Sequence, residues 1–90
     1  MNLYLLEQDV NRKYGTYNAF ILTAKSKEVA KLMHPDGTLF KNVSEFNKYS
    51  VDDWARQDEV TIKYLGKATP SLNTLPVILT SYLPNMYGER

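Results

Sequence analysis

The N-terminal part of the chain carries two apolar segments that constrain the fold more than any other feature. Asn2–Gln8 (NLYLLEQ) and Tyr17–Ala24 (YNAFILTA) are both strand-like, and the second is rich in aromatic and β-branched side chains. The polar stretch between them contains Gly15, and a connection of this kind favours an antiparallel hairpin. Because side chains alternate across a strand, both faces of this hairpin are apolar. One face carries Leu3, Leu5, Ala19 and Ile21, and the other carries Tyr4, Leu6, Phe20 and Leu22.

One main helix and two further strands are predicted outside the hairpin. Ser26 is a helix N-cap, and the apolar positions after it recur at helical spacing as far as about Met33. Pro35 disfavours the α conformation at the residue before it, so the helix should end there. Val60–Gly66 alternates between apolar and polar residues, and Val77–Tyr82 is an apolar run, so each predicts a strand.

Residues 38–59 form a variable middle segment. Asn42 and Ser50 each precede an acidic residue at the spacing of a capping box. The segment therefore predicts two short helical turns, at about 43–48 and 51–56.

The order ββα, variable segment, ββ predicts a single α+β domain over residues 1–90. We expect an antiparallel sheet of about four strands with one main helix packed on one face. A helix of about two turns, roughly 12 Å long, cannot cover both faces of the hairpin. Each large apolar side chain left exposed forgoes about 1.5–3 kcal/mol of burial. Either residues 38–59 cover the second face or another protein does, and an uncovered patch marks an interaction surface.

The composition argues against most catalytic chemistry. The chain has no cysteine and a single histidine, so it lacks a thiol nucleophile and the clustered ligands of a zinc site. His34 ends the predicted helix, where a capping or turn role is expected rather than that of a general base. The adjacent acidic pairs Asp52–Asp53 and Asp58–Glu59 suit helix starts better than acid–base work. We therefore expect no enzyme activity, no catalytic residue, no metal and no cofactor.

A basic and aromatic loop joins the two hairpin strands. Arg12, Lys13, Tyr14 and Tyr17, with Lys25 further on, combine positive charge with rings that can stack on bases. The net charge is only +1, with ten acidic residues, and tyrosines beside a hairpin bend commonly pack against the strand ends. Binding of single-stranded nucleic acid is therefore the alternative function.

The N-terminal sequence MNLYLLEQD has no basic region, and its apolar run is too short for a signal peptide or a membrane span. Together with the absence of cysteine, this predicts a soluble cytoplasmic protein, intact from Met1, that does not associate with membranes.

Several short motifs follow one another along the chain. They are a Tyr-x-x-Tyr bend (YGTY), a Ser-capped helix followed by His-Pro, Trp54, the stretch VTIKYLGKA, and VILTSY. In this order they resemble a group of small uncharacterised proteins encoded by bacteriophages and prophages, over most of the chain except about residues 38–50. Gly15 and Asn18 stand where those proteins often carry Asp, and the ending also differs. The resemblance implies an accessory product of a phage or mobile element, such as a host-takeover factor or a defence inhibitor.

These observations predict a non-enzymatic accessory protein that binds and occludes a host or phage protein in the host cytoplasm, as an anti-CRISPR-like factor does. The expected partner is another protein, and a homodimer is the simplest case because identical patches pair symmetrically. The aromatic residues are the expected protein contacts, and the basic loop residues serve the nucleic-acid alternative. The predicted binding residues are Tyr4, Arg12, Lys13, Tyr14, Tyr17 and Phe20.

Overall fold

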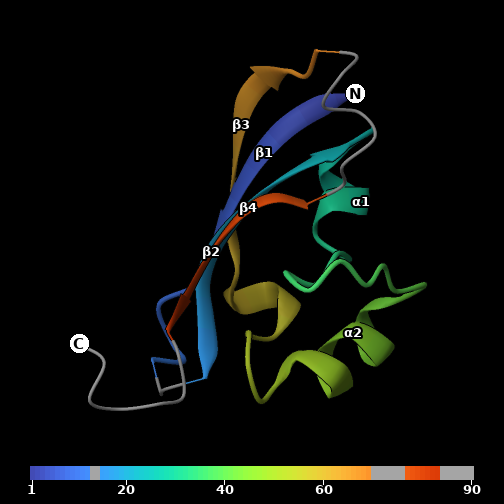
Figure 1. Ribbon diagram of the computed structural model, residues 1–90. Coiled ribbons are helices and arrows are strands. Elements are labelled where there is room, and N and C mark those ends of the chain that lie inside the picture. Colours follow the sequence, from blue (N-terminus) through green and yellow to red (C-terminus); the bar gives the residue numbers. More distant parts are fainter. Residues whose placement is uncertain (13–14, 70–76, 84–90) are drawn as a thin grey trace.

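The sheet is antiparallel and the domain is α+β, as the sequence predicts. The structure is a computed structural model, and it describes residues 1–12, 15–69 and 77–83. The strands pair in the order β3–β1–β2–β4, so that the N-terminal hairpin forms the centre of the sheet (Figure 1). The strands are β1 (Asn2–Glu7), β2 (Thr16–Ala24), β3 (Thr61–Lys67) and β4 (Val77–Leu83).

The hairpin register keeps each apolar set on its own face. Leu5 pairs with Ile21, and Leu6 pairs with Phe20, so neighbouring rungs point to opposite sides of the sheet. β1 pairs with β3 on its other edge, where Leu5 lies opposite Lys63. A shift of one residue would exchange the two faces, so burial of one face fixes this register.

The first helix, α1 (Lys27–Ala30), is one turn long, and the prediction that it reaches Met33 is wrong. Its start is as expected, because the Ser26 hydroxyl accepts from the Val29 amide at 3.3 Å. Beyond the helix the Met33 amide donates three residues back, and Met33 then forms a β-bridge with Leu39. That bridge needs extended backbone, so the helix ends before Met33.

The main helix, α2 (Val43–Ser50), lies in the segment that the sequence marks as variable. The Asn42 side chain caps it by accepting from the Glu45 amide at 2.9 Å, so the predicted first turn and its cap are confirmed. The predicted helical turn at 51–56 is confirmed only at its start, where the Trp54 amide donates to the Ser50 carbonyl at 2.9 Å. The chain then leaves the helical path and forms a 3₁₀ turn, η1 (Gln57–Glu59).

The turn after α2 is held from the hairpin loop. Asn11 Nδ2 donates to the carbonyls of Asp52 and Trp54, each at 3.1 Å. These carbonyls therefore bond to a side chain from a distant part of the chain and not to amides of a continuing helix. This contact explains why the helical turn after Ser50 does not continue to residue 56, which the local capping signal alone does not indicate.

Both α-helices lie on the same side of the sheet (Figure 1). α1 packs against β2, and Phe46 of α2 joins Trp54 and Val60, from the segment that follows α2, in the same buried core as Leu6 and Leu22. This side of the chain therefore covers the face that carries Leu6 and Leu22. Trp54, which is fully buried, packs edge-on against Phe20 with ring centroids 5.3 Å apart. The buried core comprises Tyr4, Leu6, Phe20, Leu22, Ala24, Ala30, Met33, Phe46, Trp54, Ala55 and Val60. Residues 38–59 therefore cover this face, as one of the two sequence-based alternatives required.

The opposite face of the hairpin has no described helix over it. Leu3, Leu5, Ala19 and Ile21 project from this face and are all half-buried. The hairpin therefore has one apolar face that the rest of the described chain covers and one apolar face that it leaves uncovered. We call the second one, defined by these four residues, the open face.

Candidate functional site

The open face is an apolar surface with a charged border. At its centre Leu5 lies between Ile21 on β2 and Lys63 on β3. Glu7 and Thr61 pair at one end of the same face, and both are exposed. Apolar residues at the centre with a polar rim are the usual anatomy of a protein–protein interface.

The exposed edge of the sheet at β3 is less suited to a partner than the open face. Lys63 and Lys67 are both exposed on this edge strand, and charged side chains there discourage pairing with another strand. The pairing of β1 with β3 also shifts between Leu3 and Tyr4, next to Gly66, whose φ of 138° suits glycine. An irregular, charged edge leaves the open face as the better contact surface.

Two of the predicted binding residues belong to the core. Tyr4 is 4% exposed and Phe20 is 1% exposed, because both point toward the helices. Tyr4 packs edge-on against Tyr64 at 5.9 Å, and Phe20 packs against Trp54. Neither side chain can reach a partner while the domain is folded, so we reassign both to stability. The sequence pattern defines two faces but does not tell which one the helices cover.

The hairpin loop is organised by a buried glutamine. Gln8 Nε2 donates to the carbonyls of Asn11 and Tyr17, at 2.6 and 2.8 Å. Gln8 Oε1 accepts from the amides of Val10 and Asn11, at 2.9 and 2.7 Å. Four hydrogen bonds from one amide group fix the path of the loop on either side of its bend. No motif in the sequence marks Gln8 for this role.

The basic residues of the loop do not gather into one described patch. Arg12 is exposed, with its Nε 3.3 Å from Asp9 Oδ1. Lys25 follows the other end of β2, and nine residues of strand separate the two ends by roughly 30 Å. Tyr17 is half-buried and packs against the core. Lys13 and Tyr14 lie outside the described residues.

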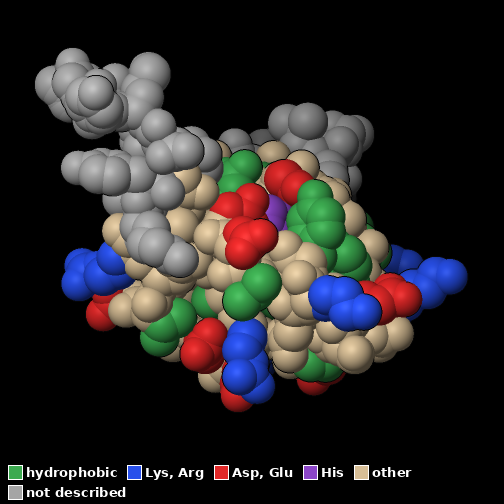
Figure 2. All heavy atoms as spheres, turned by 90° about the horizontal axis from the view of Figure 1, so that it is seen from below, with side chains coloured by type: hydrophobic (Ala, Val, Ile, Leu, Met, Phe, Trp, Pro, Cys, Tyr) green, Lys and Arg blue, Asp and Glu red, His purple; other side chains and the backbone are tan. Residues whose placement is uncertain are grey.

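The single histidine is the centre of a buried polar cluster. His34 is 0% exposed, and its Nε2 lies 2.8 Å from Asp53 Oδ1. Its Nδ1 lies 3.0 Å from the Asp36 amide and also 3.0 Å from Asp36 Oδ1. The rings of Tyr17 and Tyr49 pack edge-on against the imidazole at 5.7 and 5.1 Å. Figure 2 shows the histidine recessed between acidic and apolar side chains.

The carboxylate of Asp36 extends this cluster to α2. Tyr49 donates its hydroxyl to Asp36 Oδ2 at 2.8 Å, and the Thr38 amide donates to Asp36 Oδ1 at 2.9 Å. Partial burial raises the pKa of Asp36, but hydrogen bonds from Thr38 and Tyr49 and the nearby His34 outweigh it, so the pKa is lowered. The same bond to Asp36 raises the pKa of the Tyr49 hydroxyl.

The cluster joins three parts of the chain. His34 follows α1, Tyr49 lies in α2, and Asp53 lies in the turn after α2. The Asp53 carbonyl also accepts from the Tyr17 amide at 2.7 Å, which ties this turn to β2. Both imidazole nitrogens already have partners, so neither presents a lone pair to a substrate. The sequence suggests a turn role for His34, but not its contact with Asp53, because nothing local relates positions so far apart.

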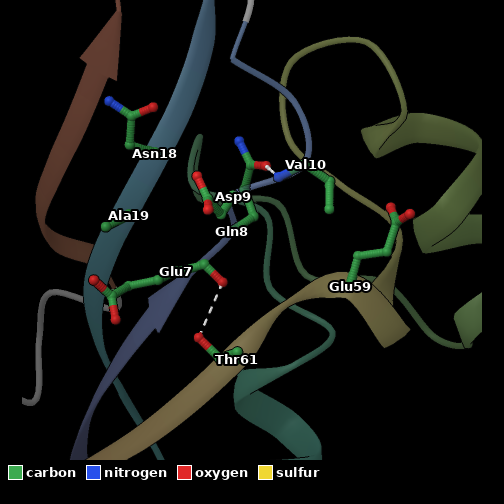
Figure 3. Close-up of a pocket in the computed structure, with 8 residues that line it drawn as sticks. All are labelled: Glu7, Gln8, Asp9, Val10, Asn18, Ala19, Glu59 and Thr61. Atoms are coloured by element: carbon green, nitrogen blue, oxygen red, sulfur yellow. Dashed lines mark hydrogen bonds between the residues drawn. The ribbon is translucent and has the colours of Figure 1, made fainter.

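A second polar region is an open hollow of about 510 Å³ beside the ends of β1 and β3. Its carboxylates, from Glu7, Asp9 and Glu59, stand apart around the hollow and do not converge (Figure 3). Glu59 also accepts from the Arg56 amide at 3.1 Å, which holds its side chain toward its own turn. Across residues 1–12, 15–69 and 77–83, no group of three or more His, Asp or Glu side chains is placed to hold a metal ion.

Comparison with protein-family models, with curated proteins and with solved structures found no match to this chain. In the parts of the chain that the structure describes, no helix is long and apolar enough to cross a membrane.

Proposed function

We propose that this chain is a non-enzymatic binding protein that attaches to another protein through the open face of its sheet. The observation that carries the proposal is the contrast between the two faces of one hairpin. The face with Leu6 and Leu22 is sealed by the helices, whereas Leu3, Leu5 and Ile21 remain half-buried with no described helix above them. Burial by a partner would complete the layer that the fold leaves open.

The mode of action in this proposal is occlusion. A protein that lays a small, rigid sheet against a target excludes competing partners without any chemistry of its own. The resemblance of the sequence motifs to phage and prophage proteins supports an accessory role of this kind in the cytoplasm of a host cell. Inhibition of a host defence or takeover of a host protein would both proceed in this way.

The first partner to test is a second copy of the chain. Strand spacing and rise give the whole four-stranded sheet, of which the open face is the central part, a footprint of roughly 450 Å². A stable interface covers about 800 Å² on each partner, so the open face alone supports a weak dimer. A tighter complex needs a partner that also reaches the rim around Glu7 and Lys63.

The experiment compares two matched double variants. Leu5→Thr with Ile21→Thr removes apolar surface from the open face while keeping strand propensity. Leu39→Thr with Val51→Thr replaces apolar side chains of similar size at exposed positions outside the sheet. Sedimentation at increasing concentration measures self-association, and affinity capture from the host measures other partners.

We expect the open-face variant to lose self-association or its captured protein, and the control variant to keep it. Equal binding by both variants would overturn the proposal. The same proteins are assayed with single-stranded oligonucleotides at low and high salt. Salt-sensitive binding that disappears in Arg12→Ala would instead support the nucleic-acid alternative.

A further inference from the structure

Two contacts at one ring nitrogen of His34 exclude each other. Nδ1 lies 3.0 Å from the Asp36 amide, which can only donate, and 3.0 Å from Asp36 Oδ1, which as a carboxylate oxygen can only accept. An imidazole nitrogen carries either one lone pair or one hydrogen in the ring plane, so the two bonds cannot exist together. On the other side of the ring, the hydrogen-bond partner that the described residues give Nε2 is the carboxylate of Asp53, which can only accept, so Nε2 carries a hydrogen in both cases.

We propose that the turn from His34 to Asp36 is a switch set by one proton. In neutral His34, Nδ1 accepts from the Asp36 amide while Nε2–H donates to Asp53. When the ring takes up a proton at Nδ1, the new N–H donates to Asp36 Oδ1 and the Asp36 amide loses its acceptor. The ring is then an imidazolium between two carboxylates, with Asp36 Oδ1 3.0 Å from Nδ1 and Asp53 Oδ1 2.8 Å from Nε2.

The described groups around the ring can stabilise both the neutral and the protonated form of His34. Asp36 and Asp53 are the carboxylates in contact with the ring, from the turn after α1 and the turn after α2. Tyr49 from α2 and Tyr17 from β2 cover its edges. No Lys or Arg among the described residues forms an ion pair with either carboxylate that would compete with the imidazolium.

The switch is connected to α2 through Asp36. Its Oδ1 accepts from the Thr38 amide and its Oδ2 accepts from the Tyr49 hydroxyl. When Oδ1 accepts from the charged ring, the hydrogen bonds that the Asp36 carboxylate accepts from the Thr38 amide and the Tyr49 hydroxyl become weaker. The proton on His34 therefore changes the attachment of the C-terminal end of α2, on the side of the molecule away from the open face. This inference does not depend on the proposed function.

Nuclear magnetic resonance at a series of pH values between about 8 and 5 tests the proposal. At high pH we expect the Nε2–H tautomer of His34 and a downfield, slowly exchanging Asp36 amide. As the ring gains its proton, the Asp36 amide should move upfield and exchange faster, with the same midpoint as the ring nitrogens. An Nδ1–H tautomer at high pH would overturn the proposal. So would an Asp36 amide whose chemical shift and exchange rate do not change when the ring gains its proton.

Two variants separate the switch from a merely structural histidine. His34→Asn keeps a side-chain oxygen near the position of Nδ1, so the Asp36 amide should stay bonded and indifferent to pH in this range. Tyr49→Phe removes only the hydroxyl bond to Asp36, so the Asp36 amide should still titrate while the response of the α2 amides becomes smaller. If His34→Asn does not fold, the wild-type titration and Tyr49→Phe still decide the matter.

Discussion

Replacing Phe46 with alanine tests whether α2 is a structural cover for the sheet or a loosely attached helix. Of the eight residues of α2, only Phe46 and Ser50 are buried, and Phe46 is 1% exposed. Its ring packs edge-on against Phe40 at 5.9 Å. A buried Phe→Ala substitution costs about 3–5 kcal/mol, which includes the transfer of the ring and the cavity left behind.

That cost is large compared with the stability of so small a domain. At about 0.05–0.15 kcal/mol per residue, a chain of this length has a free energy of unfolding of roughly 5–13 kcal/mol. Phe46→Ala should therefore remove roughly a quarter or more of it. Val43, on the same helix, is 43% exposed, so Val43→Ala should cost under about 1 kcal/mol and serves as the matched control.

Urea denaturation followed by tryptophan fluorescence measures both variants. Trp54 is the only tryptophan in the chain and is fully buried under this part of the fold, so its emission reports exposure of the sealed face. A loss of less than about 1 kcal/mol in Phe46→Ala, or a loss equal to that of Val43→Ala, would refute the claim that α2 seals the sheet.

Substitutions at three further positions test the hydrogen bonds and the backbone. Because the pKa of Asp36 is lowered in the fold, the ionised Asp36 side chain stabilises the protein above about pH 4, and this stabilisation is lost as pH falls through the lowered pKa. Asp36→Asn should therefore be less stable than the wild type at neutral pH and should lose less stability on acidification. Melting temperatures between pH 7 and 2 would show both effects. Gln8→Glu leaves two carbonyls without donors and should cost about 2–5 kcal/mol in urea denaturation, with partial recovery when the new carboxyl is protonated; an unchanged midpoint would contradict the role of the Gln8 amide. Gly37 has φ of 98° with no atom within 4 Å of an added Cβ, so Gly37→Ala should cost about 1–2 kcal/mol from backbone strain alone, and Gly37→Asn should cost less by the same assay.

Local signals predicted the parts of the fold that depend on neighbours in sequence. The hairpin follows from two apolar segments around a polar bend, and the N-caps at Ser26 and Asn42 follow from their side-chain oxygens. The strand at Val60–Gly66 follows from its alternation and differs from β3 by one residue at each end. These elements are set by rules that act over a few positions.

The features that the sequence did not predict all depend on contacts between distant residues. Leu39 pairs with Met33 and shortens the first helix, and Asn11 bonds to the carbonyls that a second helix would have used. The same limit applies to the sites. Alternation places Tyr4 and Leu5 on opposite faces but does not tell which face the helices cover, so the predicted contacts Tyr4 and Phe20 fall on the sealed face. The bond from His34 to Asp53 has no local signature either.

The difference between the two faces of β2 can be measured most directly with single cysteines. The chain has no cysteine, so Ile21→Cys and Leu22→Cys each introduce one thiol, at adjacent positions on opposite faces of the same strand. In dilute native solution, a small maleimide should modify the thiol at position 21 quickly and the thiol at position 22 slowly. The thiol at position 22 should reach the rate of the unfolded chain only when the protein is denatured. Equal protection at both positions, or faster modification at position 22, would contradict an open face and the binding role built on it.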